Sequence, residues 1–261
     1  MPEDRTTPWP EDLFEFAYVP DMPDNLRRLA EQAEQEDWNY HNTPSDKPYP
    51  ILYNYFRYTY RRIAEERKIA LSEDGQACCF NTGLVTPNQE PLYAYFETNR
   101  AEEAQKWYFK GWFRRGERGL NKFPELPDLA HYFDDPTCLV FDGRRDLRIN
   151  IEHIIAETPR ERFPEPYRTM QDYGLQTLIK GAIDNTRERV RRSYKTAIPQ
   201  YYRGQVQILL PLCLSHAQRA DLALVVERHA TFYRAATGLT LDMAYNNARQ
   251  LARPDRDWLQ P

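Results

Sequence analysis

The stretch that decides the fold of the first half of the chain is residues 76–96, QACCFNTGLVTPNQEPLYAYF. Two apolar runs, 76–80 and 92–96, flank a polar segment that begins at Asn81-Thr82-Gly83. Asn and Gly tolerate positive φ, and Asn and Thr side chains hydrogen-bond to the nearby backbone, so the pattern predicts two strands joined through a tight turn. Such a turn either presents hydrogen-bond donors to a ligand or serves only as a connection. Both interpretations stay open.

The segments around this pair extend the pattern into a sheet preceded by helices. Further strands are expected at 69–71 and 107–113, with a hairpin signal at 73–75. Apolar residues recur at helical spacing after Pro23 and again over 51–68. The tyrosines of 51–68 also alternate as in a strand, but the proline before this segment suits a first helical turn, so we favour a helix.

The second half of the chain predicts a helix-covered meander. We expect strands at 139–141, 205–214, 222–227 and 231–236, and helices at 150–157, 174–197 and 242–251. The three consecutive later strands have short connections, which favours antiparallel pairing. The predicted class is α+β: antiparallel sheet or sheets with helices packed on one side, N-terminal helices, and a C-terminal β-meander followed by a helix. We expect residues 1–12 to be frayed and 13–261 to form one domain.

Composition limits the class of protein. Tyrosine occurs 18 times, and the formal net charge is −4, so the chain is not basic throughout. Nucleic-acid binding is not excluded, because local clustering of cations decides it. The four cysteines lack the spacing of a disulfide framework and are predicted to be buried free thiols. The chain opens on acidic and polar residues, and no run approaches the roughly 20 apolar residues of a membrane span. We therefore expect a cytoplasmic protein without membrane contact.

The clearest chemical signal is a row of charged residues on the predicted helix 174–197. Six basic and two acidic residues lie between 180 and 195, a local net charge of +4. The residues of the row, spaced by 4, 3, 4 and 4, are Lys180, Asp184, Arg187, Arg191 and Lys195, with Arg189 and Arg192 beside them. At 100° per residue the row stays within about 80° of one helix face. It is interpreted either as a solvated face or as a surface that binds phosphates.

Tyrosines accompany these cations. Tyr201 and Tyr202 follow the row, and a second aromatic and basic patch spans 49–62, with Lys47 before it. Aromatic rings beside cations suit the stacking of single-stranded bases, and they also suit an ordinary core. The predicted nucleic-acid-binding residues are Lys47, Lys180, Arg187, Arg191, Arg192, Lys195, Tyr201 and Tyr202.

Catalytic and ligand-binding signals are weaker. His153 precedes Arg160 and Arg162, so it is the candidate for proton exchange with a phosphodiester, or else a histidine on a capped helix. Candidate ligand-binding residues are Asn81, Thr82, Gly83, Asn246 and Arg249. The histidines and cysteines lack metal-ligand spacing, and the P-loop and dinucleotide-binding patterns are incomplete, so we predict no metal and no cofactor.

Six segments together resemble one family. They are 48–52 (PYPIL), 80–86 (FNTGLVT), 199–202 (PQYY), 209–212 (LLPL), 220–226 (ADLALVV) and 241–249 (LDMAYNNAR). In this order they resemble the DUF3825 family, from about residue 13 to 259. Members of that family are sometimes joined to domains associated with RNA, such as LOTUS-type helical domains, so the resemblance implies an RNA context. It carries no set of catalytic residues.

These observations favour an RNA-associated protein. We expect it to bind single-stranded RNA or RNA ends through the cationic helix and the tyrosine patches, with metal-independent phosphodiester cleavage as an added possibility. One alternative is a hydrolase or transferase that holds a nucleotide-like substrate at Asn81-Thr82-Gly83. A second alternative is a protein-interaction module. Any enzyme among these is a phosphodiesterase, a ribonuclease or a nucleotide hydrolase.

Overall fold

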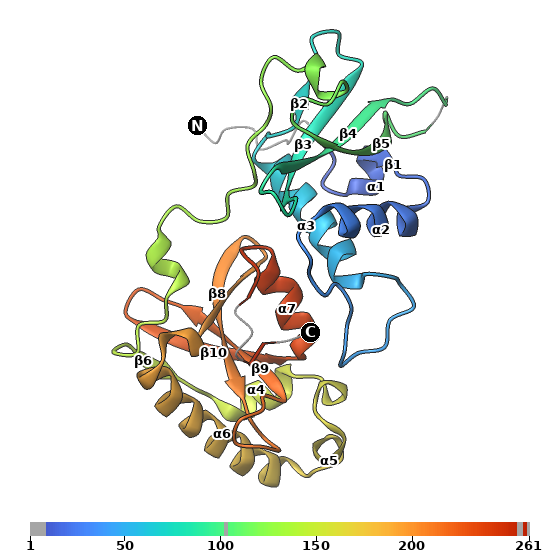
Figure 1. The fold of residues 1–261 in the computed structure, drawn as a ribbon. Helices are drawn as coiled ribbons and strands as arrows, with labels where there is room; N and C mark the ends of the chain where they lie inside the picture. Colours follow the sequence, from blue (N-terminus) through green and yellow to red (C-terminus); the bar gives the residue numbers. More distant parts are fainter. Residues whose placement is uncertain (1–8, 102–103, 255–257, 260–261) are drawn as a thin grey trace. The chain divides into compact units, whose positions relative to one another are not determined.

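The computed structural model describes residues 9–101, 104–254 and 258–259, and the chain forms two compact units (Figure 1). Residues up to Asn39 and Ser45–His131 form unit 1, and Tyr40–Pro44 with residues from Tyr132 onward form unit 2. The region predicted as one domain, 13–261, thus contains two units, each with its own five-stranded sheet. Within the described residues, no helix is both long and apolar enough to cross a membrane.

Unit 1 is a sheet packed against helices. Its helices are α1 (Leu13–Phe16), α2 (Met22–Gln32), α3 (Pro50–Glu65) and the 3-10 turn η1 (Leu120–Lys122). Its strands are β1 (Ala17–Tyr18), β2 (Ala70–Leu71), β3 (Ala77–Val85), β4 (Pro91–Thr98) and β5 (Trp107–Arg114), in the order β1-β5-β4-β3-β2. All pairs are antiparallel except β1 with β5. The predicted helix over 51–68 is confirmed as α3.

The core of unit 1 is aromatic. Phe56 and Tyr60, one turn apart on α3, meet Phe80 of β3 at ring-centroid distances of 5.7 and 5.8 Å. Phe80 in turn stacks on Phe96 of β4 at 5.7 Å. Buried aromatic side chains bring the largest apolar area per residue, and offset or tilted pairs add to it. Helix α3 is therefore fixed by packing on the strands that the opening stretch predicts.

The predicted turn at Asn81-Thr82-Gly83 is wrong. Strand β3 continues through it to Val85, with a shift in its pairing to β4 between Asn81 and Val85. Gly83 has a φ of 74°, and its N–H donates to the side-chain oxygen of Asn81 at 2.9 Å. The positive φ that suggested a turn instead forms a bulge inside a strand.

Residues 9–12 of the N-terminal segment make defined contacts with unit 1. Trp9 packs edge-on against Phe16 at 5.6 Å, Tyr60 donates to the carbonyl of Pro10 at 2.7 Å, and the Asp12 carboxylate caps α1. The predicted fraying is therefore wrong for residues 9–12, because each of these contacts fixes the chain. Residues 1–8 lie outside the described residues.

Unit 2 contains the predicted meander. Its strands are β6 (Asp146–Arg148), β7 (Ile198–Tyr202), β8 (Gln205–Leu212), β9 (Leu222–Arg228) and β10 (Phe232–Leu239), in the order β6-β10-β9-β8-β7. Its helices are α4 (Ile151–Glu157), α5 (Glu165–Arg168), α6 (Asp172–Arg192) and α7 (Leu241–Arg249), with 3-10 turns η2 (Pro136–Leu139), η3 (Arg160–Arg162) and η4 (Tyr194–Thr196). Strands β7 to β10 pair antiparallel, and β6 runs parallel to β10. The fold is α+β, with a C-terminal meander followed by a helix.

Helix α6 lies along one face of this sheet (Figure 1). Its buried residues Ile179 and Ile183 join a core with alternate residues of β8 and β9, including Leu210 and Leu224. Thr186, which is also buried, donates its hydroxyl to the carbonyl of Pro211. The apolar stripe of α6 therefore faces the sheet, and its charged residues remain on the outer side.

Three boundaries in unit 2 differ from prediction. Residues 139–141 are not a strand, because Asp135 caps η2 through Thr137 and the chain stays irregular after Leu139. The long helix ends at Arg192, where Ser193 takes an extended conformation. Strand β7 went unpredicted because it contains Pro199, which a strand tolerates at the edge of a sheet, where β7 lies.

The 40–44 segment is held to unit 2 by a buried carboxylate. Asp242, on the first turn of α7, is 1% exposed. Its two oxygens accept hydrogen bonds from the backbone N–H groups of His41 at 3.2 Å and Asn42 at 3.1 Å. A buried carboxylate requires such donors, so this contact fixes the segment in unit 2.

Candidate functional site

Four arginines converge on one cavity of unit 2. The cavity has a volume of about 360 Å³. Arg144 and Arg145 reach it from the turn before β6, and Arg187 and Arg191 reach it from α6. Asp146 also lines it, so its charged lining carries four positive and one negative side chains, a formal net of +3.

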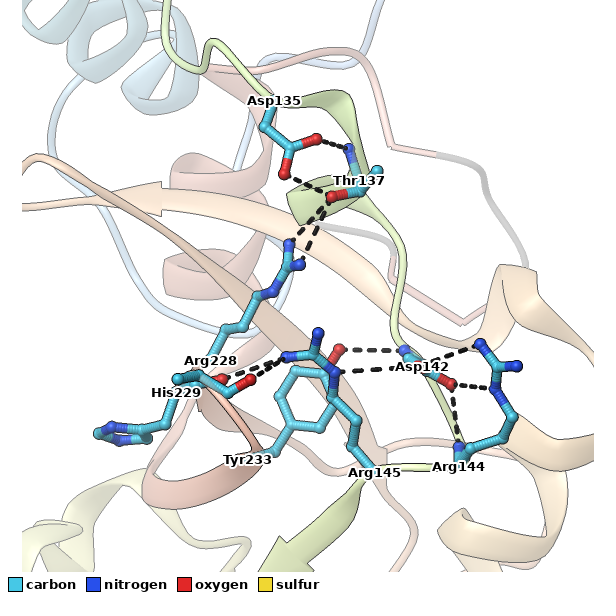
Figure 2. A network of polar contacts seen from close by, with 9 residues as sticks. Asp135, Thr137, Asp142, Arg144, Arg145, Arg228, His229 and Tyr233 are labelled. Carbon is cyan, nitrogen blue, oxygen red and sulfur yellow. Dashed lines mark hydrogen bonds and ion pairs between the residues drawn. The ribbon is translucent and has the colours of Figure 1, made fainter.

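The turn that carries Arg144 and Arg145 is pinned at Asp142 (Figure 2). The Asp142 N–H donates to the hydroxyl of Tyr233 on β10 at 3.0 Å, and the Arg145 N–H donates to the Asp142 carbonyl at 3.0 Å. The Asp142 carboxylate accepts from the Arg144 backbone at 3.1 Å and from its Nε at 3.0 Å. The Arg144 guanidinium, followed by its backbone N–H, lowers the pKa of Asp142. This carboxylate therefore remains charged at neutral pH.

Arg145 is anchored by backbone carbonyls. Its Nη1 donates to the carbonyls of His229 at 3.1 Å and Ala230 at 3.3 Å, as Figure 2 shows for His229. Its guanidinium carbon lies 5.9 Å from the ring centroid of Tyr233, and Phe141 stacks on the same ring at 4.4 Å. Arg145 thus has a fixed position beside the stacked rings of Tyr233 and Phe141.

The same network continues to η2 through Arg228. Its guanidinium lies 3.4 and 3.5 Å from the hydroxyl of Thr137, which donates to Asp135 (Figure 2). Residues of β9 and β10 therefore support both ends of the 135–145 loop.

The α6 side of the cavity is tied to β6. Arg187 donates from Nη2 to the carbonyl of Leu147 at 2.7 Å, and Arg191, one turn later, lies 3.1 Å from Glu188. Each guanidinium has five N–H donors, so these contacts leave donors for a ligand. A ligand that suits several convergent guanidinium groups is an oxyanion, above all a phosphate.

The predicted cationic row is shorter in the structure than in the sequence. Arg187 and Arg191 line the cavity, and Lys180 is exposed earlier on α6. Arg192 donates from Nε to the carbonyl of Glu188 at 3.0 Å. Lys195 lies in η4, beyond the end of α6, and lines a different cavity of about 430 Å³. The prediction that one helix carries the whole row is wrong at Lys195.

The predicted aromatic residues and Lys47 also lie in different environments. Tyr201 is buried and packs edge-on against Tyr132 at 4.7 Å, so its ring belongs to the core of unit 2. Tyr202 is exposed, with the Arg203 guanidinium 5.2 Å from its ring. Lys47 belongs to unit 1, where its Nζ lies 4.3 Å from the ring of Tyr53.

His153 lies in the first turn of α4 with an exposed side chain. The Asn150 side chain caps the helix, because it accepts a hydrogen bond from the His153 backbone N–H at 3.1 Å. The two arginines predicted to assist it hold the fold: Arg160 pairs with Asp172, and Arg162 donates to the Gly238 carbonyl at 2.9 Å.

The predicted ligand residues lie in two places. In β3, Thr82 is 1% exposed and donates its hydroxyl to the carbonyl of Leu92 at 2.7 Å, so it ties β3 to β4. On α7, Asn246 is buried and donates to the hydroxyl of Tyr40. Arg249 ends the same helix. Across the described ranges of the chain, no group of three or more His, Cys, Asp or Glu is placed to hold a metal ion.

Comparison with known families gives a match over most of the chain. The model of DUF3825, a domain of unknown function, covers residues 29–258. The chain belongs to the DUF3825 family. This match confirms the resemblance seen in the sequence. No curated protein and no solved structure matches the chain.

The site of this DUF3825 chain includes two residues that sequence reasoning missed, Arg144 and Arg145. A signal was present, because two adjacent arginines follow the Asp142-Gly143 turn. The sequence did not indicate that this turn and α6 border one cavity, since 42 positions separate Arg145 from Arg187. The family name carries no activity, so the function rests on the geometry of the cavity.

Proposed function

We propose that this DUF3825 protein binds single-stranded RNA through unit 2, with phosphate groups held by the arginine cavity. The observation that carries the proposal is the convergence of Arg144, Arg145, Arg187 and Arg191 on about 360 Å³. Convergent guanidinium groups form bidentate, charge-assisted hydrogen bonds with phosphate oxygens. The RNA context implied by the family resemblance supports the choice of nucleic acid.

Charge supports the same proposal. The chain carries a formal −4, yet the charged lining of the cavity sums to +3, so its cations are concentrated in one place. Exposed aromatic rings also lie in unit 2, namely Tyr194 in η4 and Tyr202 in β7. Bases of a single strand stack on such rings without regard to sequence, at about 1–3 kcal/mol per base.

The test is the salt dependence of RNA binding. Fluorescence anisotropy with a labelled single-stranded RNA should give a logarithmic affinity that falls linearly with the logarithm of salt, by about 0.7 per phosphate contact. The double variant Arg187→Ala/Arg191→Ala should weaken binding at least about tenfold and flatten that slope. Arg28→Ala is the matched control, because Arg28 is an exposed helix arginine of unit 1 that pairs with Asp24 at 2.8 Å. Absence of binding at low salt, or equal losses in the two variants, would refute the proposal.

Cleavage by His153 stays a prediction with a separate test. The same RNA, incubated with EDTA and run on a denaturing gel, should yield products with the wild-type chain and none with His153→Ala. Intact RNA with both proteins would refute cleavage and leave RNA binding unaffected.

A further inference from the structure

We propose that the arginine cavity recognises the terminal phosphate of an RNA strand, a phosphate monoester, in preference to the phosphodiesters within the strand. The inference rests on the proposed function, since it concerns the same four arginines. It adds the part of the RNA that the cavity holds.

The charge of the cavity favours a phosphate monoester. An internal phosphodiester carries one negative charge, whereas a phosphate monoester carries about −1.5 to −2 at pH 7 and has three strong acceptor oxygens. The cavity lining carries four arginines and one aspartate, a formal net of +3. A dianion with three free oxygens therefore matches the cavity better than a single phosphodiester does.

The shape of the cavity favours a single end group. Successive phosphodiesters are best bound by a row of cations, because they are spaced along a strand. Here the cations of two separate segments surround one volume of about 360 Å³, near the lower end of the 300–1,000 Å³ typical of small-ligand pockets. Such a volume suits one end group.

Two of the four arginines are preorganised by backbone carbonyls. Arg145 is held by the carbonyls of His229 and Ala230, and Arg187 is held by the carbonyl of Leu147. Neither anchor depends on a ligand, so both guanidinium groups are in place before binding. Less side-chain entropy is then lost when a phosphate arrives.

The remaining two arginines are more exposed. Arg144 has a side chain that is 92% exposed and contacts Asp142, and Arg191 is 67% exposed and contacts Glu188. A phosphate in the cavity offers each of them a stronger acceptor. We therefore expect Arg144 and Arg191 to add affinity for the end group while contributing little to folding.

Asp146 gives the proposal a variant that should act in the opposite direction. Its carboxylate lines the cavity and lies 3.4 Å from Arg148. A negative charge at the cavity repels a dianion more than a monoanion. Asp146→Asn should therefore strengthen binding of a phosphorylated end more than binding of a hydroxyl end.

The experiment uses RNA strands of one sequence with a 5′-phosphate, a 3′-phosphate or hydroxyl groups at both ends, each labelled at an unmodified end. Anisotropy with the full chain should show about tenfold or greater preference for one phosphorylated end. Arg191→Ala and Arg144→Ala should remove most of that preference, Asp146→Asn should increase it, and the control Arg28→Ala should retain it. Circular dichroism of each variant checks that the fold is intact.

The outcomes separate the two levels of the proposal. Equal, salt-sensitive affinity for phosphorylated and hydroxyl ends would overturn end recognition and leave RNA binding standing. A lack of binding to all strands would refute the proposed function itself. An unlabelled phosphorylated strand and a nucleoside monophosphate are each used to displace the labelled RNA. Equal potency of these two competitors would assign the cavity to free nucleotides and overturn the inference.

Discussion

Gly83→Ala is predicted to destabilise unit 1 by an amount that depends on Tyr55. Gly83 has a φ of 74°, and a Cβ at this position would lie 2.6 Å from the Tyr55 hydroxyl oxygen. That hydroxyl donates to the carbonyl of Thr82 at 3.0 Å from a buried position on α3. Left-handed backbone costs alanine about 1–2 kcal/mol, and displacement of the hydroxyl costs a hydrogen bond worth about 0.5–1.5 kcal/mol. The sum is about 1.5–3.5 kcal/mol.

A double-mutant cycle separates these two contributions. In the Tyr55→Phe background the oxygen is absent, and the nearest ring atom, Cζ, lies 3.9 Å from the added Cβ, an ordinary contact. Gly83→Ala should then cost only the backbone part, about 1–2 kcal/mol. The coupling between the two substitutions should be about 1 kcal/mol.

The assay is urea unfolding followed by tryptophan fluorescence. Four of the five tryptophans, at positions 9, 38, 107 and 112, belong to unit 1, so the signal reports chiefly on that unit. A cost of Gly83→Ala below about 0.5 kcal/mol, or the same cost in both backgrounds, would refute the reasoning.

Three further predictions concern buried or paired groups. Asp242→Ala should destabilise unit 2 by about 2–4 kcal/mol, because the backbone donors of 41–42 lose a buried charged acceptor. Thermal unfolding measures this loss of stability, and faster amide exchange at 41–42 localises it. Burial raises the pKa of Cys79 to about 12, so this thiol should resist a disulfide reagent at pH 8 until the chain is unfolded, and rapid native labelling would contradict its burial. The Arg144 guanidinium lowers the pKa of Asp142, so the stabilisation from this pair is complete above the ordinary pKa of 3.8 and is lost as pH falls through the lower folded value. NMR titration should find a higher pKa for Asp142 in Arg144→Ala, and an unchanged value would show that the guanidinium is not the cause.

The elements that the sequence predicts correctly are those whose pattern is long. Helix α3 and helix α6 each carry several turns of apolar spacing, and the meander carries three apolar runs of strand length. The errors occur where a residue typical of a turn or of a strand break is accommodated by its place in a sheet. Gly83 has the backbone of a turn residue but forms a bulge in a paired strand, and Pro199 is compatible with β7 because that strand lies at an edge.

The candidate site was predictable in part for the same reason. Arg187 and Arg191 share a helix face, so spacing alone brings them together. Arg144 and Arg145 join them through β6, which pairs with β10 at the far end of the chain. That pairing is a tertiary contact, and no periodicity within 141–191 encodes it.

The contact between Asp242 and the 40–44 segment limits how the gene for this protein can recombine. Unit 2 takes these five residues from the middle of the sequence of unit 1, so neither unit is one uninterrupted stretch of chain. A gene fragment that begins at residue 132 would encode the meander and the arginine cavity, yet it would lack the His41 and Asn42 donors that the Asp242 carboxylate binds in the full chain. Recombination that moves only one unit would therefore produce a damaged product. We expect the two units to be inherited together in one gene, which agrees with a family match that spans both.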